Sequence, residues 1–309
     1  MIICIAHKKD LDGLGSHAIV RRYAKKENLD IEHHFVSYDD LGEVFRQIEG
    51  SEGNLIVVAD LGYNSKIPLE TVKSLYANNR FIWIDHHDWS SGRKLLEAGF
   101  KFIHSNERCA AELVWNYFLP EDRVAKRIAR LAHVHDFRDE GELAWKLYDV
   151  ISSGYDKLKF VDFLARGITW NDVFQEVYED YQKVKEKGYD YLEKHMVVVK
   201  VGKYSCIMAI SKKYLSSTLA SLYLQEKGSD FVIVLYPDGK MSFRRNNPEV
   251  NLAKMAELFN GGGRAVAAGG RLDKEINEEN FKIVTEEIVD IISRKIHEIA
   301  HVQESITTH

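Results

Sequence analysis

The most informative stretch of the sequence is Phe81-Ile82-Trp83-Ile84-Asp85-His86-His87. Its four apolar residues are enough for a short buried strand, and three polar residues follow them directly. Polar groups at the end of a buried strand cost free energy unless something bonds to them. The stretch therefore predicts a strand whose end carries part of a functional site.

Two more apolar stretches in the first half of the chain end in polar residues in the same way. The strand expected at Ile2–Ala6 precedes His7-Lys8-Lys9-Asp10-Leu11-Asp12-Gly13, and the strand expected at Leu55–Ala59 precedes Asp60. Helical patterns lie between and after the strands, at residues 14–24, 68–77, 109–118 and 122–134. Near-continuous apolar strands that alternate with helices predict an α/β fold with a doubly wound, mainly parallel sheet.

The polar clusters after these strands predict a metal site. In open α/β sheets ligands bind beyond the carboxyl ends of the strands, so the clusters should converge at one edge. A fourth cluster contains Asp136 and follows a helix expected to end near Val134. Carboxylates mixed with imidazoles suit Mn²⁺ or a similar divalent ion. A single Asp after a strand is usually a helix cap, so the prediction depends on the clusters taken together.

The second half of the chain predicts a helical linker and a second, smaller α/β domain. Residues 171–195 are charged and rich in Tyr, which favours one or two long helices. Strands are then expected at residues 196–199, 206–210, 231–236 and 241–244, and helices at 252–259 and 278–300. We therefore predict a first domain over residues 1–170, a helical linker over 171–195 and a second domain over 196–309.

Composition excludes several classes of protein. The chain has 309 residues, 45% of them hydrophobic, and a net charge of −5, which excludes a disordered chain and a strongly basic nucleic-acid binder. No apolar run is long enough for a membrane helix, and the first residues do not resemble a secretory signal. Three widely spaced cysteines favour a reducing, cytoplasmic setting. Residues 197–275 carry 12 Lys plus Arg against 7 Asp plus Glu, which favours a clamp for a polyanion or a merely solvated surface.

The motifs resemble those of the DHH phosphoesterases, which carry a companion DHHA1 domain. The four motifs of that family are similar to His7-x-x-Asp10-x-Asp12-Gly13, Asp60, Asp85-His86-His87 and Asp136. The DHHA1 signature resembles two further segments, namely Ser242-Phe243-Arg244 and Gly261-Gly262-Gly263-Arg264-Ala265-Val266-Ala267-Ala268-Gly269. The family usually has His after its three glycines, where this chain has Arg264.

The resemblance implies a role for each matched residue. Two divalent ions are expected, Mn²⁺ first, with Mg²⁺ or Co²⁺ as alternatives. Asp60 would bridge them, with His7 and Asp10 on one ion and Asp12, His86 and Asp136 on the other. Asp85 would orient a ligand imidazole and His87 would contact the scissile phosphate. The substrate would be bound by Arg244, Gly261, Gly262, Gly263 and Arg264.

The activity implied by the resemblance is hydrolysis of single-stranded RNA, DNA or short oligonucleotides, with 3′-to-5′ exonuclease polarity preferred. A 5′-to-3′ exonuclease of the RecJ type and a phosphodiesterase for cyclic dinucleotides or phosphoadenosine phosphate remain alternatives. A non-catalytic nucleic-acid-binding scaffold is the alternative from another class. A homodimer and a replication or repair partner are left open.

Overall fold

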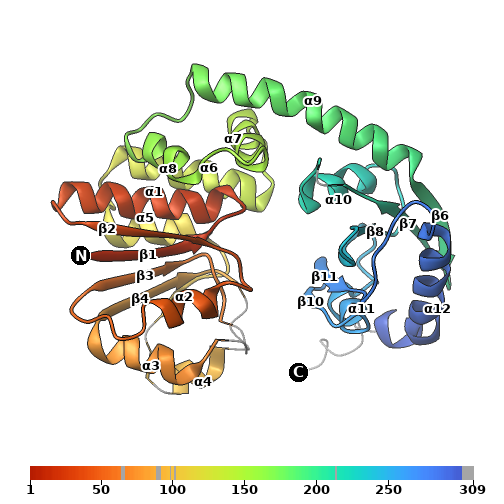
Figure 1. Cartoon of the computed structure of the whole chain (residues 1–309), viewed down its shortest axis with the longest axis horizontal. Coiled ribbons are helices and arrows are strands. Elements are labelled where there is room, and N and C mark those ends of the chain that lie inside the picture. The colour runs from red at the N-terminus through yellow and green to blue at the C-terminus, as the bar shows by residue number, and fades with distance from the viewer. Residues whose placement is uncertain (64–66, 88–91, 98, 101, 213, 301–309) are drawn as a thin grey trace, which may run out of the picture. The chain divides into compact units, whose positions relative to one another are not determined.

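A five-stranded parallel sheet forms the centre of the first half of the chain (Figure 1). The computed structural model describes residues 1–309 except 64–66, 88–91, 98, 101, 213 and 301–309. The strands are β1 (Ile2–His7), β2 (Ile31–Val36), β3 (Leu55–Ala59), β4 (Arg80–Asp85) and β5 (Phe102–His104). The strands lie in the order β2-β1-β3-β4-β5, and all neighbouring pairs are parallel.

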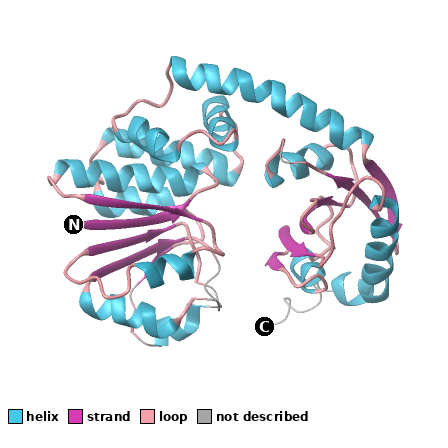
Figure 2. Cartoon of the chain, in the orientation of Figure 1, coloured by secondary structure: helices cyan, strands magenta, loops and turns pink. Residues whose placement is uncertain are grey.

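Alternate residues of the strands build two apolar layers, one on each face of the sheet. Cys4 and Val57 pack in the layer that includes buried residues of α1, α5 and α6, whereas Ile5 and Val58 pack in the layer of α2 and α3 (Figure 2). The helices of this half are α1 (Leu11–Lys26), α2 (Leu41–Gln47), α3 (Leu69–Asn78), α4 (Arg93–Glu97), α5 (Ala110–Phe118), α6 (Arg123–Phe137), α7 (Glu142–Ser152) and α8 (Lys157–Ala165). The predicted doubly wound α/β fold is confirmed.

The strand order places the change of winding direction between β1 and β3. From β1 the chain moves to β2 on one side, and from β3 it moves to β4 and β5 on the other. Beyond the carboxyl ends of two such strands the loops separate and leave room for a ligand. His7 ends β1, and Asp60 follows β3 directly.

Contacts within the chain define two compact units, Met1–Tyr181 and Gln182–His309. Helix α9 (Asp172–Lys194) is a single helix that crosses from one unit into the next. The predicted domain bounds 1–170, 171–195 and 196–309 remain a prediction, and residues 301–309 lie outside the described part.

The second unit contains a six-stranded mixed sheet in the order β10-β11-β9-β8-β7-β6. Strands β7 and β8 are parallel, and the other neighbours are antiparallel. The strands are β6 (Met196–Val201), β7 (Tyr204–Ile210), β8 (Phe231–Leu235), β9 (Lys240–Arg245), β10 (Gly262–Arg264) and β11 (Ala267–Arg271). The helices are α10 (Ser217–Gln225), α11 (Leu252–Glu257) and α12 (Phe281–Ala300). The sequence predicted strands and helices in the C-terminal part of the chain, and the structure has a second sheet with helices there.

Two local expectations were wrong. No strand was expected at the glycines assigned to substrate binding, but Gly262 and Gly263 belong to β10, which pairs with β11. Asp136 was expected after the end of a helix, but it lies in the last turn of α6. Within the described residues, no helix is both long and apolar enough to cross a membrane.

Candidate metal centre

Asp60 lies at the centre of the polar cluster beyond β1 and β3. Its φ of 56° is in the left-handed region, which is uncommon for a residue other than Gly and concentrates at functional sites. Its side chain lies between two imidazoles, with Oδ2 3.4 Å from His7 Nδ1 and Oδ1 3.5 Å from His86 Nε2. This carboxylate therefore belongs to two groups of possible metal ligands, one with His7 and Asp10 and one with His86 and His87.

The first candidate metal group consists of His7, Asp10 and Asp60. Asp10 caps the N-terminus of α1 by accepting a hydrogen bond from the Gly13 N–H at 3.0 Å, and its Oδ2 lies 2.7 Å from His7 Nδ1. A Cβ atom at Gly13 would lie 2.3 Å from the carbonyl oxygen of His7. Glycine at this position therefore lets α1 begin directly against the end of β1, which brings the three ligands together.

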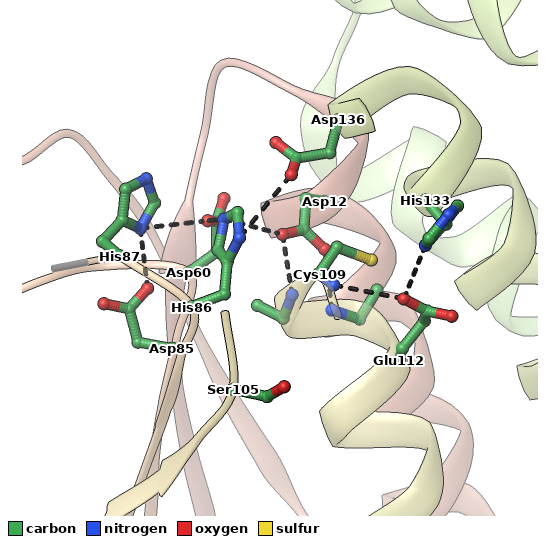
Figure 3. A network of polar contacts seen from close by, with 12 residues as sticks. Asp12, Asp60, Asp85, His86, His87, Ser105, Cys109, Glu112, His133 and Asp136 are labelled. Carbon is green, nitrogen blue, oxygen red and sulfur yellow. Dashed lines mark hydrogen bonds and ion pairs between the residues drawn. The ribbon is translucent and has the colours of Figure 1, made fainter. Parts of the chain in front are cut away.

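The second candidate group consists of Asp12, His86 and Asp136 (Figure 3). His86 is between the two carboxylates, with Nε2 3.6 Å from Asp12 Oδ2 and Nδ1 3.6 Å from Asp136 Oδ2. Three separate elements supply these ligands: the first turn of α1, the end of β4 and the last turn of α6. All six expected metal ligands thus lie in two groups near Asp60.

Asp12 is also bonded to the N-terminus of α5. Its two carboxylate oxygens accept hydrogen bonds from the N–H groups of Ala110 at 2.8 Å and Ala111 at 2.7 Å. These N–H groups have no partner inside the helix, and the positive end of the helix dipole favours an anion there. The bonds fix the orientation of Asp12 toward His86.

The electrostatics of the cluster suit a divalent cation. Burial lowers the pKa of His7 and His86, but the carboxylates around them raise it more, to about 10 in each case. Burial and the neighbouring Asp60 raise the pKa of Asp12 well above its usual value. In addition, Asp60 Oδ2 and His86 Nε2 are buried without a hydrogen-bond partner among the described residues. Buried polar atoms need such a partner, and oxygen and imidazole ligands fit Mn²⁺ or Mg²⁺.

A second chain of polar contacts runs through His87. Its Nδ1 lies 2.8 Å from Oδ1 of the fully buried Asp85, and its Nε2 lies 2.8 Å from the hydroxyl of Tyr38. Burial lowers the pKa of His87, but the bond to Asp85 raises it above the usual value. Asp85 therefore orients His87 rather than His86. Tyr38, in the turn after β2, was missed because nothing in the sequence marks that turn as part of the site.

His135 is another residue that the sequence did not assign. It is 9% exposed, its ring packs between Trp145 and Tyr148, and neither ring nitrogen has a hydrogen-bond partner among the described residues. Burial lowers its pKa, and the charges of Asp10 and Asp60 act against this shift. An uncharged imidazole without partners thus lies within electrostatic reach of the first metal group.

In the second unit, Arg244 of β9 is 8% exposed, and its Nε and Nη1 have no hydrogen-bond partner among the described residues. Its neighbours Met241 and Phe243 pack in the core with α11 and α12, so strand alternation directs Arg244 to the opposite face. Ser242 shares that face and contacts Ser221 of α10 at 3.2 Å.

The glycine segment is largely explained by packing. A Cβ atom at Gly261 would lie 2.0 Å from the carbonyl oxygen of Gly269, and one at Gly263 would lie 2.6 Å from Cα of Ala268. Gly262 has open space around its Cα, and Arg264 is exposed. Packing therefore accounts for Gly261 and Gly263 but not for Gly262.

Comparison with known proteins gives two matches to protein families. Residues 1–134 match the DHH family, N-terminal domain, and residues 204–294 match the DHHA1 domain. The chain belongs to the DHH/DHHA1 phosphoesterases. Enzymes of this family use divalent metals, which agrees with the two ligand groups. The DHH match ends before Asp136, so the assignment of that ligand depends on its contacts with His86.

Solved structures share the fold at low identity. A pGpG-specific phosphodiesterase, PggH from Vibrio cholerae, is 14% identical with a TM-score of 0.57, and the match covers 95% of this chain and 99% of that protein. An exopolyphosphatase-related protein from Bacteroides fragilis is 16% identical with a TM-score of 0.58, covering 96% and 93%. RecJ from Thermus thermophilus in complex with Mn²⁺ is 15% identical with a TM-score of 0.62, covering 95% of this chain and 52% of RecJ. No curated protein sequence matches the chain significantly.

Proposed function

We propose that this DHH/DHHA1 protein is a Mn²⁺-dependent phosphodiesterase that hydrolyses single-stranded nucleic acid, preferably as a 3′-to-5′ exonuclease or oligoribonuclease. The observation that carries the proposal is the position of Asp60 between His7 and His86, at 3.4 and 3.5 Å. This bridging position supports two cations that share one carboxylate. Such a pair supplies a nucleophilic hydroxide and neutralises the charge on the phosphate oxygens.

The other residues of the cluster would bind the cations and contact the phosphate. His7 and Asp10 would hold one cation, and Asp12, His86 and Asp136 would hold the other. His87 would contact the scissile phosphate, with its ring held by Asp85 at Nδ1 and by the Tyr38 hydroxyl at Nε2, each at 2.8 Å. Since bound cations would activate water, no Ser or Cys nucleophile would be needed, and the buried cysteines agree with this.

The second unit would bind the rest of the substrate. Arg244 offers a buried guanidinium with two unpartnered nitrogen atoms, which suits a phosphate group. Arg264 and Gly262, both exposed on β10, would contribute a second contact to the backbone of the nucleic acid. Gly261 and Gly263 would act indirectly, by allowing β10 to pack closely on β11.

A second candidate substrate is a short linear dinucleotide. The pGpG phosphodiesterase is matched over 99% of its length, whereas RecJ is matched over only 52%, so the chain has the size of the dinucleotide enzyme. RecJ-type 5′ polarity is tested beside it, and cyclic dinucleotides and phosphoadenosine phosphate are the substrates to test if no strand is cleaved. A binding scaffold without activity is disfavoured because all six expected metal ligands lie in the two groups.

The test is a cleavage time course with Mn²⁺ on 5′-labelled single-stranded RNA and DNA of several lengths, with EDTA and Asp60→Ala as controls. A ladder that shortens from the unlabelled end supports a 3′-to-5′ exonuclease. Immediate release of labelled mononucleotide indicates 5′ polarity, and cleavage of only the shortest substrates indicates a dinucleotide enzyme. Full activity of Asp60→Ala would refute the two-metal assignment.

A further inference from the structure

Helix α6 carries a row of cations on its exposed face. The four exposed residues Arg123, Lys126, Arg127 and Arg130 are spaced so that they share one face of the helix. The opposite face packs into the core through Ala125, Ile128, Ala129, Ala132 and His135. Among the residues that the structure describes, none of the four cations pairs with an acid, and Lys126 lies 5.4 Å from the ring of Trp115.

Several other cations of the same unit have an acidic partner. Arg22 pairs with Asp122, Lys8 with Asp40 and Lys146 with Glu142, whereas no acidic residue occurs between Arg123 and His135. Like charges three or four residues apart on a helix repel each other and destabilise it. An uncompensated cationic row on a chain of net charge −5 is therefore a local surface that attracts anionic groups.

The same face of α6 ends in two stacked rings beside the metal centre. His133 and Phe137 continue the spacing from Arg130, and their ring centroids lie 4.4 Å apart with an interplanar angle of 23°. Phe137 is 40% exposed, and the adjacent residue Asp136 belongs to the second metal group. Figure 3 shows Asp136 directed toward Asp12 and His86, and His133 directed toward Glu112. Along α6, the cationic residues are therefore followed in the last turn by an exposed aromatic ring and a candidate metal ligand.

We propose that this face, the α6 stripe (Arg123, Lys126, Arg127, Arg130 and Phe137), binds a single-stranded nucleic acid whose reacting end lies at the metal centre. The cations would contact successive phosphates over about 10 Å of helix, and Phe137 would stack on a base. An acidic protein would use the cations but would leave the exposed ring unexplained. The proposal rests on the proposed function for its substrate class, and it adds residues of the first unit to the contacts proposed for the substrate.

Binding without hydrolysis tests the stripe separately from the chemistry. Fluorescence anisotropy in EDTA would follow labelled single-stranded DNA and RNA of about twelve nucleotides as the salt concentration rises. In the test variant Arg123, Lys126, Arg127 and Arg130 are all changed to Gln, which preserves helix propensity. The matched control changes Lys25, Lys157, Lys159 and Lys282 to Gln, with the same loss of charge. We expect the slope of log K against log salt to fall by about 3 in the test variant only, since each phosphate contact contributes about 0.7.

Equal binding by the test and control variants would overturn the proposal, as would absence of oligonucleotide binding by the wild type. The second outcome would leave an acidic protein as the partner of the stripe. If the fourfold variant does not fold, the double change Arg127→Gln with Arg130→Gln is used, with an expected fall in slope of about 1.4.

Kinetics separate the stripe from the proposed function. In the fourfold variant we expect KM to rise at least tenfold for long strands, with kcat and KM for a dinucleotide unchanged. Phe137→Ala should weaken binding about tenfold for every base, because stacking does not depend on sequence. If the wild type binds strands in EDTA but cleaves none with Mn²⁺, the proposed function fails and the stripe stands. If the wild type cleaves long strands and the fourfold variant does so equally well, the proposed binding by the α6 stripe is refuted and the proposed function is supported.

Discussion

Asp12 and Ala111 are joined by a 2.7 Å hydrogen bond that spans 99 residues of sequence. The other oxygen of the same carboxylate accepts the N–H of Ala110, and one of the two, Oδ2, also lies 3.6 Å from His86 Nε2. One side chain therefore both secures the N-terminus of α5 and belongs to a metal group. Asp60 differs, since its Oδ2 has no hydrogen-bond partner among the described residues.

Asn substitutions at these two positions should separate stability from metal binding. An Asn at 12 has only one acceptor oxygen, so one buried N–H of α5 would lose its partner. We expect Asp12→Asn to lower the free energy of unfolding in EDTA by about 2 kcal/mol more than Asp60→Asn does. Both variants should lose high-affinity Mn²⁺ binding. Urea denaturation in EDTA and calorimetric Mn²⁺ titration measure the two effects, and equal stabilities would show that the α5 contact contributes little.

His135→Phe should weaken metal binding without unfolding the protein. Phe retains the ring contacts with Trp145 and Tyr148 and removes two buried nitrogen atoms that lack partners. If His135 bonds to a water of the first metal group, Mn²⁺ affinity should fall about tenfold. The matched control is His133→Phe on the same helix, which should leave Mn²⁺ affinity unchanged. Wild-type affinity in His135→Phe would assign the residue to packing alone.

Tyr38→Phe should lower kcat about tenfold and leave Mn²⁺ affinity unchanged. The variant removes the hydroxyl that lies 2.8 Å from His87 Nε2, while Asp85 still holds Nδ1. A tenfold fall in kcat corresponds to about 1.4 kcal/mol of lost transition-state stabilisation. Tyr76→Phe, which changes a ring packed on Phe100 outside the site, is the control. An equal fall in kcat in Tyr38→Phe and Tyr76→Phe would argue against a role for the Tyr38 hydroxyl.

Asp122→Asn should reduce stability in a pH-dependent way. Asp122 is buried, caps α6 through Val124 and Ala125, and pairs with Arg22 and Lys26. Burial opposes the shift, but the bonds from Arg22 and Lys26 hold the pKa of Asp122 below its usual range. A depressed carboxyl pKa stabilises the folded state above the ordinary Asp value of about 4, and this stabilisation is lost as pH falls below it.

Because Asn can still cap the helix, the variant isolates the charge. We expect a loss of about 1–2 kcal/mol at pH 7, discounted for the partial exposure of both cations, and a smaller loss below pH 4. Asp156→Asn is the control, since Asp156 caps α8 through the Lys159 N–H and the described residues give it no cationic partner. A loss that does not change with pH would mean that the cap alone matters.

The sequence predicted the central sheet well because its inner strands are buried on both faces. The stretches at 2–6, 55–59 and 81–84 lie within β1, β3 and β4 with at most two residues of difference at the ends. Strand β2 was missed because it is an edge strand that reads Ile31-Glu32-His33-His34-Phe35-Val36, and half-buried positions accept polar residues. The pairing of Gly262 and Gly263 in β10 was missed because glycine has no preference for strands.

The candidate site could be predicted only where a motif marks it. The resemblance indicated six ligands, and the structure brings all six into two groups. It did not indicate Tyr38 or His135, because their proximity depends on a turn after an edge strand and on the packing of α6 against α7. The cationic row on α6 was not predicted as a site, because the excess of acidic residues outside residues 197–275 hides it in the charge balance of the chain.

The ligands of the metal centre extend along the chain from His7 to Asp136. During translation His7, Asp10 and Asp12 leave the ribosome first, about a hundred residues before the α5 N–H groups that orient Asp12. A nascent chain can therefore offer a cation only a loose, partial site until α5 and α6 have emerged and packed. Metal loading should be a late step in biosynthesis, and a protein made without sufficient divalent metal should still fold and then accept the ion afterwards.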